Sequence, residues 1–294
     1  MIHPARLETL ADLRVEIDCI DSELHQLLIK RGEIIHRLIE AKQRQGGGSA
    51  FRPGREADMM RGLVARHEGL LPLDTVESIW RIIISTFTYV QSPYSVHADI
   101  SGGDGAMRDC CRFHFGFTVP YVPHKGAASV IEAVASSTGD LGLIRVEADS
   151  EAEAAADPWW RRLEEPQAPK IIARLPFVER PDHPAGMPLF VVAQPLAEAA
   201  VRDVCLYAVL ADGWKGSAPS HLAAIDADIV GAAPDGAKPS LLVAVDGKVT
   251  PQQLREALTQ AGAIAPQIAE IGGHAARFDA SEAQRPPAPF EAAQ

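Results

Sequence analysis

A long stretch without helix breakers constrains the fold of this chain most. Residues 7–45 contain no proline and a single glycine, Gly32, before the run Gly46-Gly47-Gly48 ends them. One side of the predicted helix carries residues spaced alternately three and four apart, the spacing of a seam that packs against another helix. These residues are Arg14, Ile17, Asp21, Leu24, Leu28, Arg31, Ile35, Leu38 and Lys42. A helix of this length extends roughly 60 Å, so it cannot bury its seam within one small monomer, and we expect a helical homodimer.

Three cations, Arg14, Arg31 and Lys42, occupy seam positions where leucine would pack better. Burying a guanidinium or an ammonium costs several kcal/mol unless an anion meets it. Carboxylates such as Asp21 or Glu40 would pair with them and merely fix the helix register. Alternatively, the cations line a cavity for an anionic small molecule. The seam alone leaves both interpretations open.

Two further helices are predicted before Pro93. Pro53 suits a first helical turn, and the second helix runs from there to about Gly69. The third runs from about Asp74 to Gln91. It has a three–four seam of its own, formed by Leu73, Val76, Trp80, Ile83, Phe87 and Val90.

The second and third helices add polar groups to the cations of the first. Arg55 and Glu56 stand side by side in a first helical turn, and Gln91 ends the third helix. The set has no nucleophile paired with a base and no phosphate-binding loop. It suits a reaction of an anionic substrate that requires only positioning and electrostatic stabilisation.

Composition and charge exclude several classes of function. With 47% hydrophobic and 23% charged residues the chain has globular values, and its net charge of −11 argues against a nucleic-acid partner. The first 97 residues contain 12 Lys and Arg against 13 Asp and Glu, so nearly all of the negative excess lies beyond them. There is no apolar run of the roughly 20 residues that span a bilayer, no signal-peptide core and no metal-ligand motif. Four cysteines without a C-x-x-C pair indicate reduced thiols. We therefore expect a cytoplasmic protein without a metal or a membrane segment.

The spacing of the polar set resembles the all-helical class of chorismate mutase over residues 8–92. The family pattern is an Arg, a second Arg seventeen residues later, a Lys eleven further, an Arg-Glu pair after a loop and a Gln ending the last helix. The residues that meet it are Arg14, Arg31, Lys42, Arg55, Glu56 and Gln91. The resemblance implies a three-helix domain in an intertwined homodimer. It also implies a cofactor-free rearrangement of the dianion chorismate to prephenate.

The same resemblance implies a role for each residue. Arg31 and Arg55 would clamp carboxylates, with Arg14 reaching in from the partner protomer. Lys42 and Gln91 would hydrogen-bond the ether oxygen. Glu56 would hold the ring hydroxyl.

Two positions depart from the family pattern. Arg52 stands where the family commonly has Asp, three residues before the Arg-Glu pair, and it either replaces a lost substrate contact or faces solvent. We include it among the candidate substrate-binding residues. Phe87 stands where the family commonly has a serine that touches a carboxylate, so we expect weaker substrate affinity but not loss of activity.

Beyond residues 1–97, the predicted mutase domain, short β-rich runs alternate with Ala-rich helical stretches, which indicates an α/β region over 98–198. The acidic stretch 147–165 is expected on the surface. Residues 199–280 suggest a small α+β unit that resembles an ACT domain, and 281–294 a disordered tail. This order resembles bifunctional chorismate mutase–prephenate dehydratases and leaves open an aromatic amino acid as effector.

The chain lacks the reactive Thr-Arg pair of the dehydratase family that it resembles. The family carries an Asp or Asn, five residues, then Thr-Arg-Phe, whereas Asp182 is followed after five residues by Pro188, Leu189 and Phe190. Because proline and leucine carry neither a hydroxyl nor a charge, we expect a catalytically inactive module. Three alternatives remain: an active bifunctional enzyme, a non-catalytic sensor of chorismate-like acids, and a helical lyase acting on isochorismate.

Overall fold

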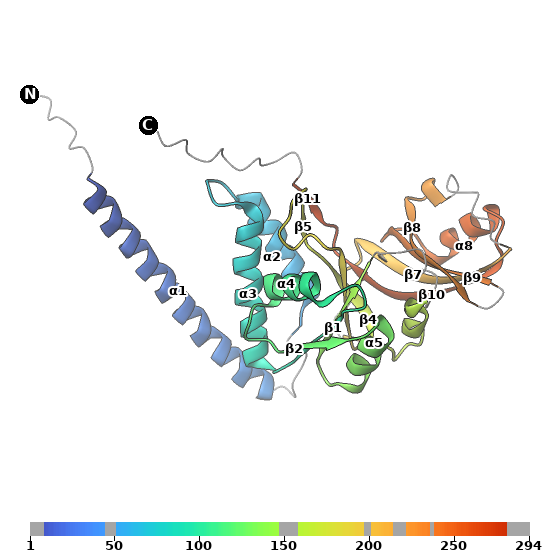
Figure 1. Ribbon diagram of the computed structural model, residues 1–294, viewed down its shortest axis with the longest axis horizontal. Coiled ribbons are helices and arrows are strands. Elements are labelled where there is room, and N and C mark those ends of the chain that lie inside the picture. The colour runs from blue at the N-terminus through green and yellow to red at the C-terminus, as the bar shows by residue number, and fades with distance from the viewer. Residues whose placement is uncertain are drawn as a thin grey trace, which may run out of the picture. The chain divides into compact units, whose positions relative to one another are not determined.

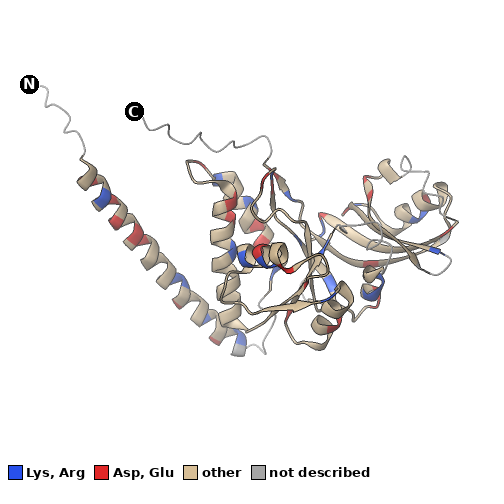
Figure 2. Ribbon diagram, in the orientation of Figure 1, with Lys and Arg blue, Asp and Glu red and all other residues tan. Residues whose placement is uncertain are grey.

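The computed structural model describes residues 9–44, 51–146, 158–196, 201–213, 222–235 and 238–280. The chain divides into two compact units, residues 1–48 and 49–294. The first unit contains one helix, α1 (Leu10–Arg44), close to the predicted bounds. Lys, Arg, Asp and Glu are distributed along its whole length (Figure 2). The run Gly46-Gly47-Gly48 and the predicted disordered tail lie outside the described residues.

The second unit begins with two packed helices, α2 (Pro53–Arg66) and α3 (Leu73–Gln91). Pro53 opens α2 as predicted, since a proline at the first helical position sacrifices no intrahelical hydrogen bond. Helix α4 (Asp104–Phe115) packs beside α3 (Figure 1). Helix α4 was not among the predicted helices.

A mixed nine-stranded sheet forms the rest of this unit, in the order β2-β1-β3-β6-β4-β10-β7-β9-β8 (Figure 1). Its first three strands run parallel to one another, and most of the other neighbours are antiparallel. The strands are β1 (Val96–Asp99), β2 (Tyr121–His124), β3 (Leu141–Arg145), β4 (Lys170–Leu175), β6 (Leu189–Ala193), β7 (Val204–Asp212), β8 (Ala227–Asp235), β9 (Lys238–Asp246) and β10 (Ile264–His274). The remaining elements are α5 (Ala127–Ser136), the 3-10 helix η1 (Trp159–Leu163), α8 (Pro251–Gln260), and the short parallel pair β5 (Val178–Glu179) and β11 (Phe278–Asp279).

The sheet is continuous between its α/β part and its C-terminal part. The connection is the parallel pairing of β4 with β10, where Gly272 lies opposite Ile171. Beyond it β10, β7, β9 and β8 are antiparallel, and α8, which begins with a capping box at Thr250, covers them. The predicted domain bounds and the ACT-like character of this part stay predictions.

Different helices pack on the two faces of the parallel strands, α4 on one and α5 on the other. Val96 and Ala98 pack with Met107 of α4, whereas Val130 of α5 packs with Ile144 from the other face. This alternation follows from the period of two along a strand.

The expectation of a surface stretch was wrong for part of residues 147–165. Trp160 and Leu163 in η1 are buried in the core next to Ala127 and Val130 of α5. Arg161 and Glu164 beside them stay partly exposed and form an ion pair of 3.0 Å, so the apolar side chains are buried without leaving an unpaired charge in the core.

Candidate active site

Helix α3 buries its polar stripe within the second unit. Its buried side chains are Leu73, Asp74, Glu77, Arg81, Ser85 and Thr88. The predicted apolar seam of the same helix is half-buried at Trp80 and Ile83, and Val90 is 58% exposed. Most of the buried residues of α3 are therefore polar, and their buried polar groups need hydrogen-bond partners.

Those partners come from α4 and from the segment after β4. The Glu77 carboxylate accepts hydrogen bonds of 3.1 Å from the backbone N–H groups of both Phe177 and Val178. Arg180 donates to Asp74 at 2.7 Å. The hydroxyl of Ser85 donates to the carbonyl oxygen of His114 at 3.1 Å. Ion pairs and backbone hydrogen bonds thus attach α3 to the α/β region.

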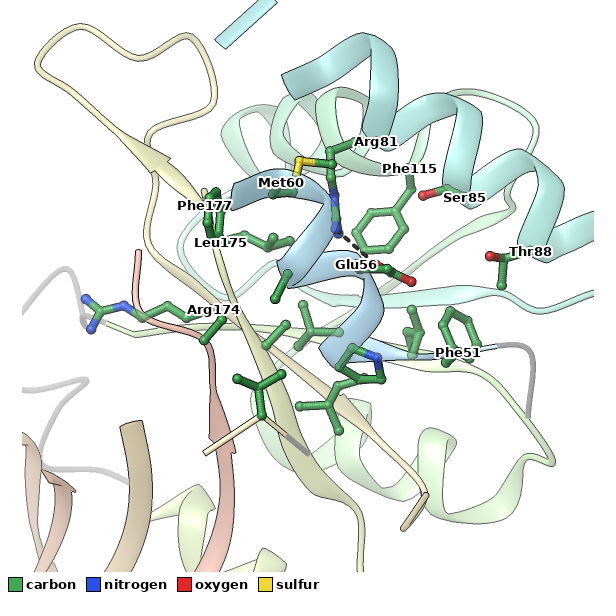
Figure 3. A pocket seen from close by; sticks show the side chains of 18 of the residues that line it. Phe51, Glu56, Met60, Arg81, Ser85, Thr88, Phe115, Arg174, Leu175 and Phe177 are labelled. Atoms are coloured by element: carbon green, nitrogen blue, oxygen red, sulfur yellow. Dashed lines mark hydrogen bonds and ion pairs between the residues drawn. The ribbon is translucent and has the colours of Figure 1, made fainter. Parts of the chain in front are cut away.

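An ion pair joins α2 to α3 at the centre of this contact. Arg81 Nη1 donates to Glu56 Oε2 at 3.1 Å, and the Arg81 guanidinium lies 5.9 Å from the centre of the Phe115 ring (Figure 3). Arg81 is 8% exposed, whereas the Glu56 side chain retains 23% exposure. Burial raises the pKa of Glu56 above its ordinary value, and the charge of Arg81 opposes that rise.

Neighbouring titratable groups respond to the same burial. The pKa of Glu77 rises to about 7, because burial outweighs the charge of Arg81 and the two backbone donors. Burial holds the pKa of His114 well below its usual value, and the Arg81 charge acts in the same direction. Arg81 is thus flanked by two carboxylates and a neutral imidazole.

A cavity of about 60 Å³ adjoins the Glu56–Arg81 pair. Figure 3 shows Phe51, Glu56, Met60, Ser85 and Thr88 on the helical side, with Phe115, Leu175 and Phe177 contributed by the α/β region. The volume is small against the roughly 300–1,000 Å³ of ordinary small-molecule pockets. A volume of that size holds water molecules beside the Glu56–Arg81 pair.

The predicted site residues fall into two groups. Arg14 is exposed on α1, and Arg31 and Lys42 are half-buried there. All three belong to the first unit.

The other group lies in the second unit. Arg52 and Arg55 are exposed at the start of α2, and Glu56 lines the cavity. Gln91 ends α3 and donates to the carbonyl oxygen of Phe87 at 3.0 Å.

The structure brings Glu56 together with Arg81, a residue that the sequence analysis missed. A polar stripe of α3 could have identified Arg81 from the sequence, because its residues repeat at three- and four-residue spacing next to the apolar seam. These residues are Asp74, Glu77, Arg81, Ser85 and Thr88. Among the described residues, no group of three His, Cys, Asp or Glu side chains is arranged to hold a metal ion. None of the helices described here has the length and apolarity needed to cross a membrane.

Several known proteins are similar in sequence to part of this chain. A bifunctional chorismate mutase/prephenate dehydratase of Pseudomonas aeruginosa is 28% identical over 149 residues, which cover 49% of this chain and 40% of that protein. One of Neisseria gonorrhoeae is 33% identical over 89 residues, covering 30% and 24% of the two chains. The chain thus spans less than half the length of the curated relatives it matches.

A solved structure, a prephenate dehydratase from Streptococcus mutans, aligns with 63% of this chain and 99% of its own, at 14% identity and a TM-score of 0.39. Similarity of that size does not define a fold. The N-terminal region matches a family model as well, the one described as chorismate mutase type II, over residues 13–92. Residues 13–92 are therefore a chorismate mutase type II domain, and an α/β region with a mixed sheet follows it.

Proposed function

We propose that the protein is a homodimeric chorismate mutase, which converts chorismate to prephenate without a cofactor. One observation carries the proposal: the set Arg14, Arg31, Lys42, Arg55, Glu56 and Gln91 has the family spacing and lies within the family match over residues 13–92. The reaction is an isomerisation in which the ether C–O bond breaks while a C–C bond forms in the same molecule.

The residues suit this chemistry because it needs no nucleophile. Arg31 and Arg55 clamp the carboxylates, and Lys42 and Gln91 donate to the ether oxygen as negative charge develops on it. A ~10⁶-fold acceleration requires about 8 kcal/mol, and one preorganised donor supplies roughly 3–4 kcal/mol. Several of these groups must therefore act together.

Exposed apolar side chains on α1 support the dimer. Leu10, Val15 and Leu27 are among the large apolar residues of this helix that remain more than half exposed in the single chain. Apolar surface of that extent along one helix favours association with a second copy. Arg14 from the partner protomer would then complete the substrate site.

The α/β region is proposed to lack dehydratase activity. Leu189 and Phe190 begin β6 and are fully buried among the core side chains, and Pro188 precedes them. Side chains enclosed in a core offer prephenate neither a hydroxyl nor a charge.

The test follows chorismate loss by absorbance and identifies the product by mass. Lys42→Ala and Arg31→Ala are each expected to lower kcat/KM by about 10²-fold or more, the effect of removing one preorganised donor. Lys30→Ala and Arg37→Ala are matched controls, since they remove exposed cations of the same helix outside the seam. Phenylpyruvate formed without acid would contradict the inactive α/β region.

A non-catalytic sensor is the second candidate, favoured by Phe87 and Arg52, which depart from the family pattern. Chorismate binding by calorimetry without any turnover would support the sensor and reject the mutase.

A further inference from the structure

We infer that Arg81 is a positioning residue of the mutase site, which holds the Glu56 carboxylate, and that the α/β region in turn holds Arg81. The inference rests on the proposed function, in which Glu56 contacts the substrate hydroxyl. It assigns a role in the mutase reaction to a region expected to be catalytically inactive.

The first step is the geometry of the ion pair. Glu56 comes from the first turn of α2 and Arg81 from the middle of α3, and the hydrogen bond of 3.1 Å between them fixes the direction of the carboxylate. One carboxylate oxygen accepts from Arg81 Nη1, which leaves acceptor capacity on the group for a substrate hydroxyl.

Contacts from the α/β region fix the position of Arg81. The Phe115 ring of α4 lies beside its guanidinium (Figure 3). Ser85, one turn later on α3, is hydrogen-bonded to the His114 carbonyl. One turn earlier, Glu77 is bound by the Phe177 backbone N–H. Contacts to the α/β region therefore hold the turns on both sides of Arg81.

The charge of Arg81 also affects the ionisation of Glu56. The titratable groups around the pair are Glu77 on α3, His114 on α4 and Tyr94 after α3. Arg81 is the cation that favours the ionised form of Glu56 there, against the burial that favours the neutral form. Without Arg81, Glu56 takes up a proton at higher pH and turns from an acceptor for the substrate hydroxyl into a donor.

The experiment measures kcat and KM for chorismate against pH in the purified full-length protein. Arg81→Met is expected to lower kcat/KM tenfold or more at pH 7. It should also move the acid limb of the kcat/KM profile to higher pH. Arg81→Lys should restore most of the activity and return the limb toward the wild-type position. Arg161→Met removes a similar Arg–Glu pair, of 3.0 Å between Arg161 and Glu164, and should leave the profile unchanged.

A double-mutant cycle separates positioning from mere structural support. In a Glu56→Gln background, Arg81→Met should have little further effect, because its influence passes through that carboxylate. An equal tenfold loss in that background, or an acid limb that does not move in Arg81→Met, would falsify the inference.

Phe115→Leu tests whether the α/β region holds Arg81. It also replaces Arg81→Met as the test variant if circular dichroism shows that Arg81→Met does not fold. It is expected to shift the acid limb in the same direction as Arg81→Met by a smaller amount. An unchanged profile in a folded Phe115→Leu protein would overturn the role of the α/β region. A wild-type protein without turnover would instead reject the proposed function itself, so the two failures are distinguishable.

Discussion

The carboxylate of Glu77 on α3 accepts a hydrogen bond of 3.1 Å from the backbone N–H of Phe177, one hundred positions further along the chain. The next N–H, that of Val178, donates to the other carboxylate oxygen. The two N–H groups lie at the start of β5, in the hydrophobic cluster that also contains Met60 of α2 and Leu73 of α3. One side chain of the mutase domain thus satisfies two buried donors of the α/β region.

Glu77→Ala is expected to lower the free energy of unfolding by about 2–6 kcal/mol. It leaves two buried N–H groups without an acceptor, each worth roughly 1–3 kcal/mol. Urea denaturation followed by circular dichroism measures the loss. Glu68→Ala, at an exposed position after α2, serves as the control, and a loss as small as the control's would contradict the structural role of Glu77.

The same carboxyl group predicts a pH dependence of stability. The folded-state pKa of Glu77 is about 7, above the ordinary value of 4.5, so the folded state binds more protons than the unfolded state between these values. Its stabilising contribution is present below pH 4.5 and is lost as the pH rises through 7, by up to about 3 kcal/mol. Compared with the wild type, Glu77→Gln should lose less stability between pH 5 and pH 8. Parallel curves for the two proteins would show that Glu77 does not titrate in this range.

Gly272→Ala is expected to disrupt the connection between the two parts of the sheet. Gly272 has φ = +136° and lies opposite Ile171, and an added Cβ would lie 2.1 Å from the Ile171 carbonyl oxygen. Because both the backbone conformation and the contact with fixed backbone oppose the substitution, we expect a loss of about 2–3 kcal/mol or more. Hydrogen exchange should show faster exchange at β4 and β10 first. Gly105→Ala, where an added Cβ meets no atom within 4 Å, is the control.

Ser240→Ala tests how η1 is fastened to the sheet. The indole N–H of Trp160 donates to Ser240 Oγ at 2.9 Å, and both residues are buried. Removing the hydroxyl leaves the indole N–H unpaired, at a cost of roughly 1–3 kcal/mol, with a change in tryptophan fluorescence. The exposed Ser136 provides the comparison, since Ser136→Ala should change stability by less than about 0.5 kcal/mol. Equal effects at the two serines would refute the role assigned to this hydrogen bond.

Much of the helical part was predictable because its signals are local. The absence of breakers over residues 7–45 and Pro53 at a first turn predicted α1 and the start of α2 to within a few residues. The alternation of short β-rich runs with Ala-rich stretches predicted the α/β class of the following region in the same way. Helix α4 was missed because its sequence, Asp104–Phe115, has few strong helix formers and depends on packing against α3 and β1.

The sequence by itself determined which residues the proposed mutase site uses: the seam cations of α1, the Arg55–Glu56 pair and Gln91, whose order and spacing need no tertiary information. Only the tertiary structure decided that Glu56 pairs with Arg81 and that α3 buries its polar stripe against the α/β region. Helical periodicity places Arg81 on one face of a helix, but it does not say which face is buried. Which face of α3 is buried depends on backbone groups that reach it only when the chain folds. These are the carbonyl groups of Phe113 and His114 and the N–H groups of Phe177 and Val178. A buried polar stripe is stable only with such partners, because unpaired polar groups in a core cost more than the apolar contacts beside them return.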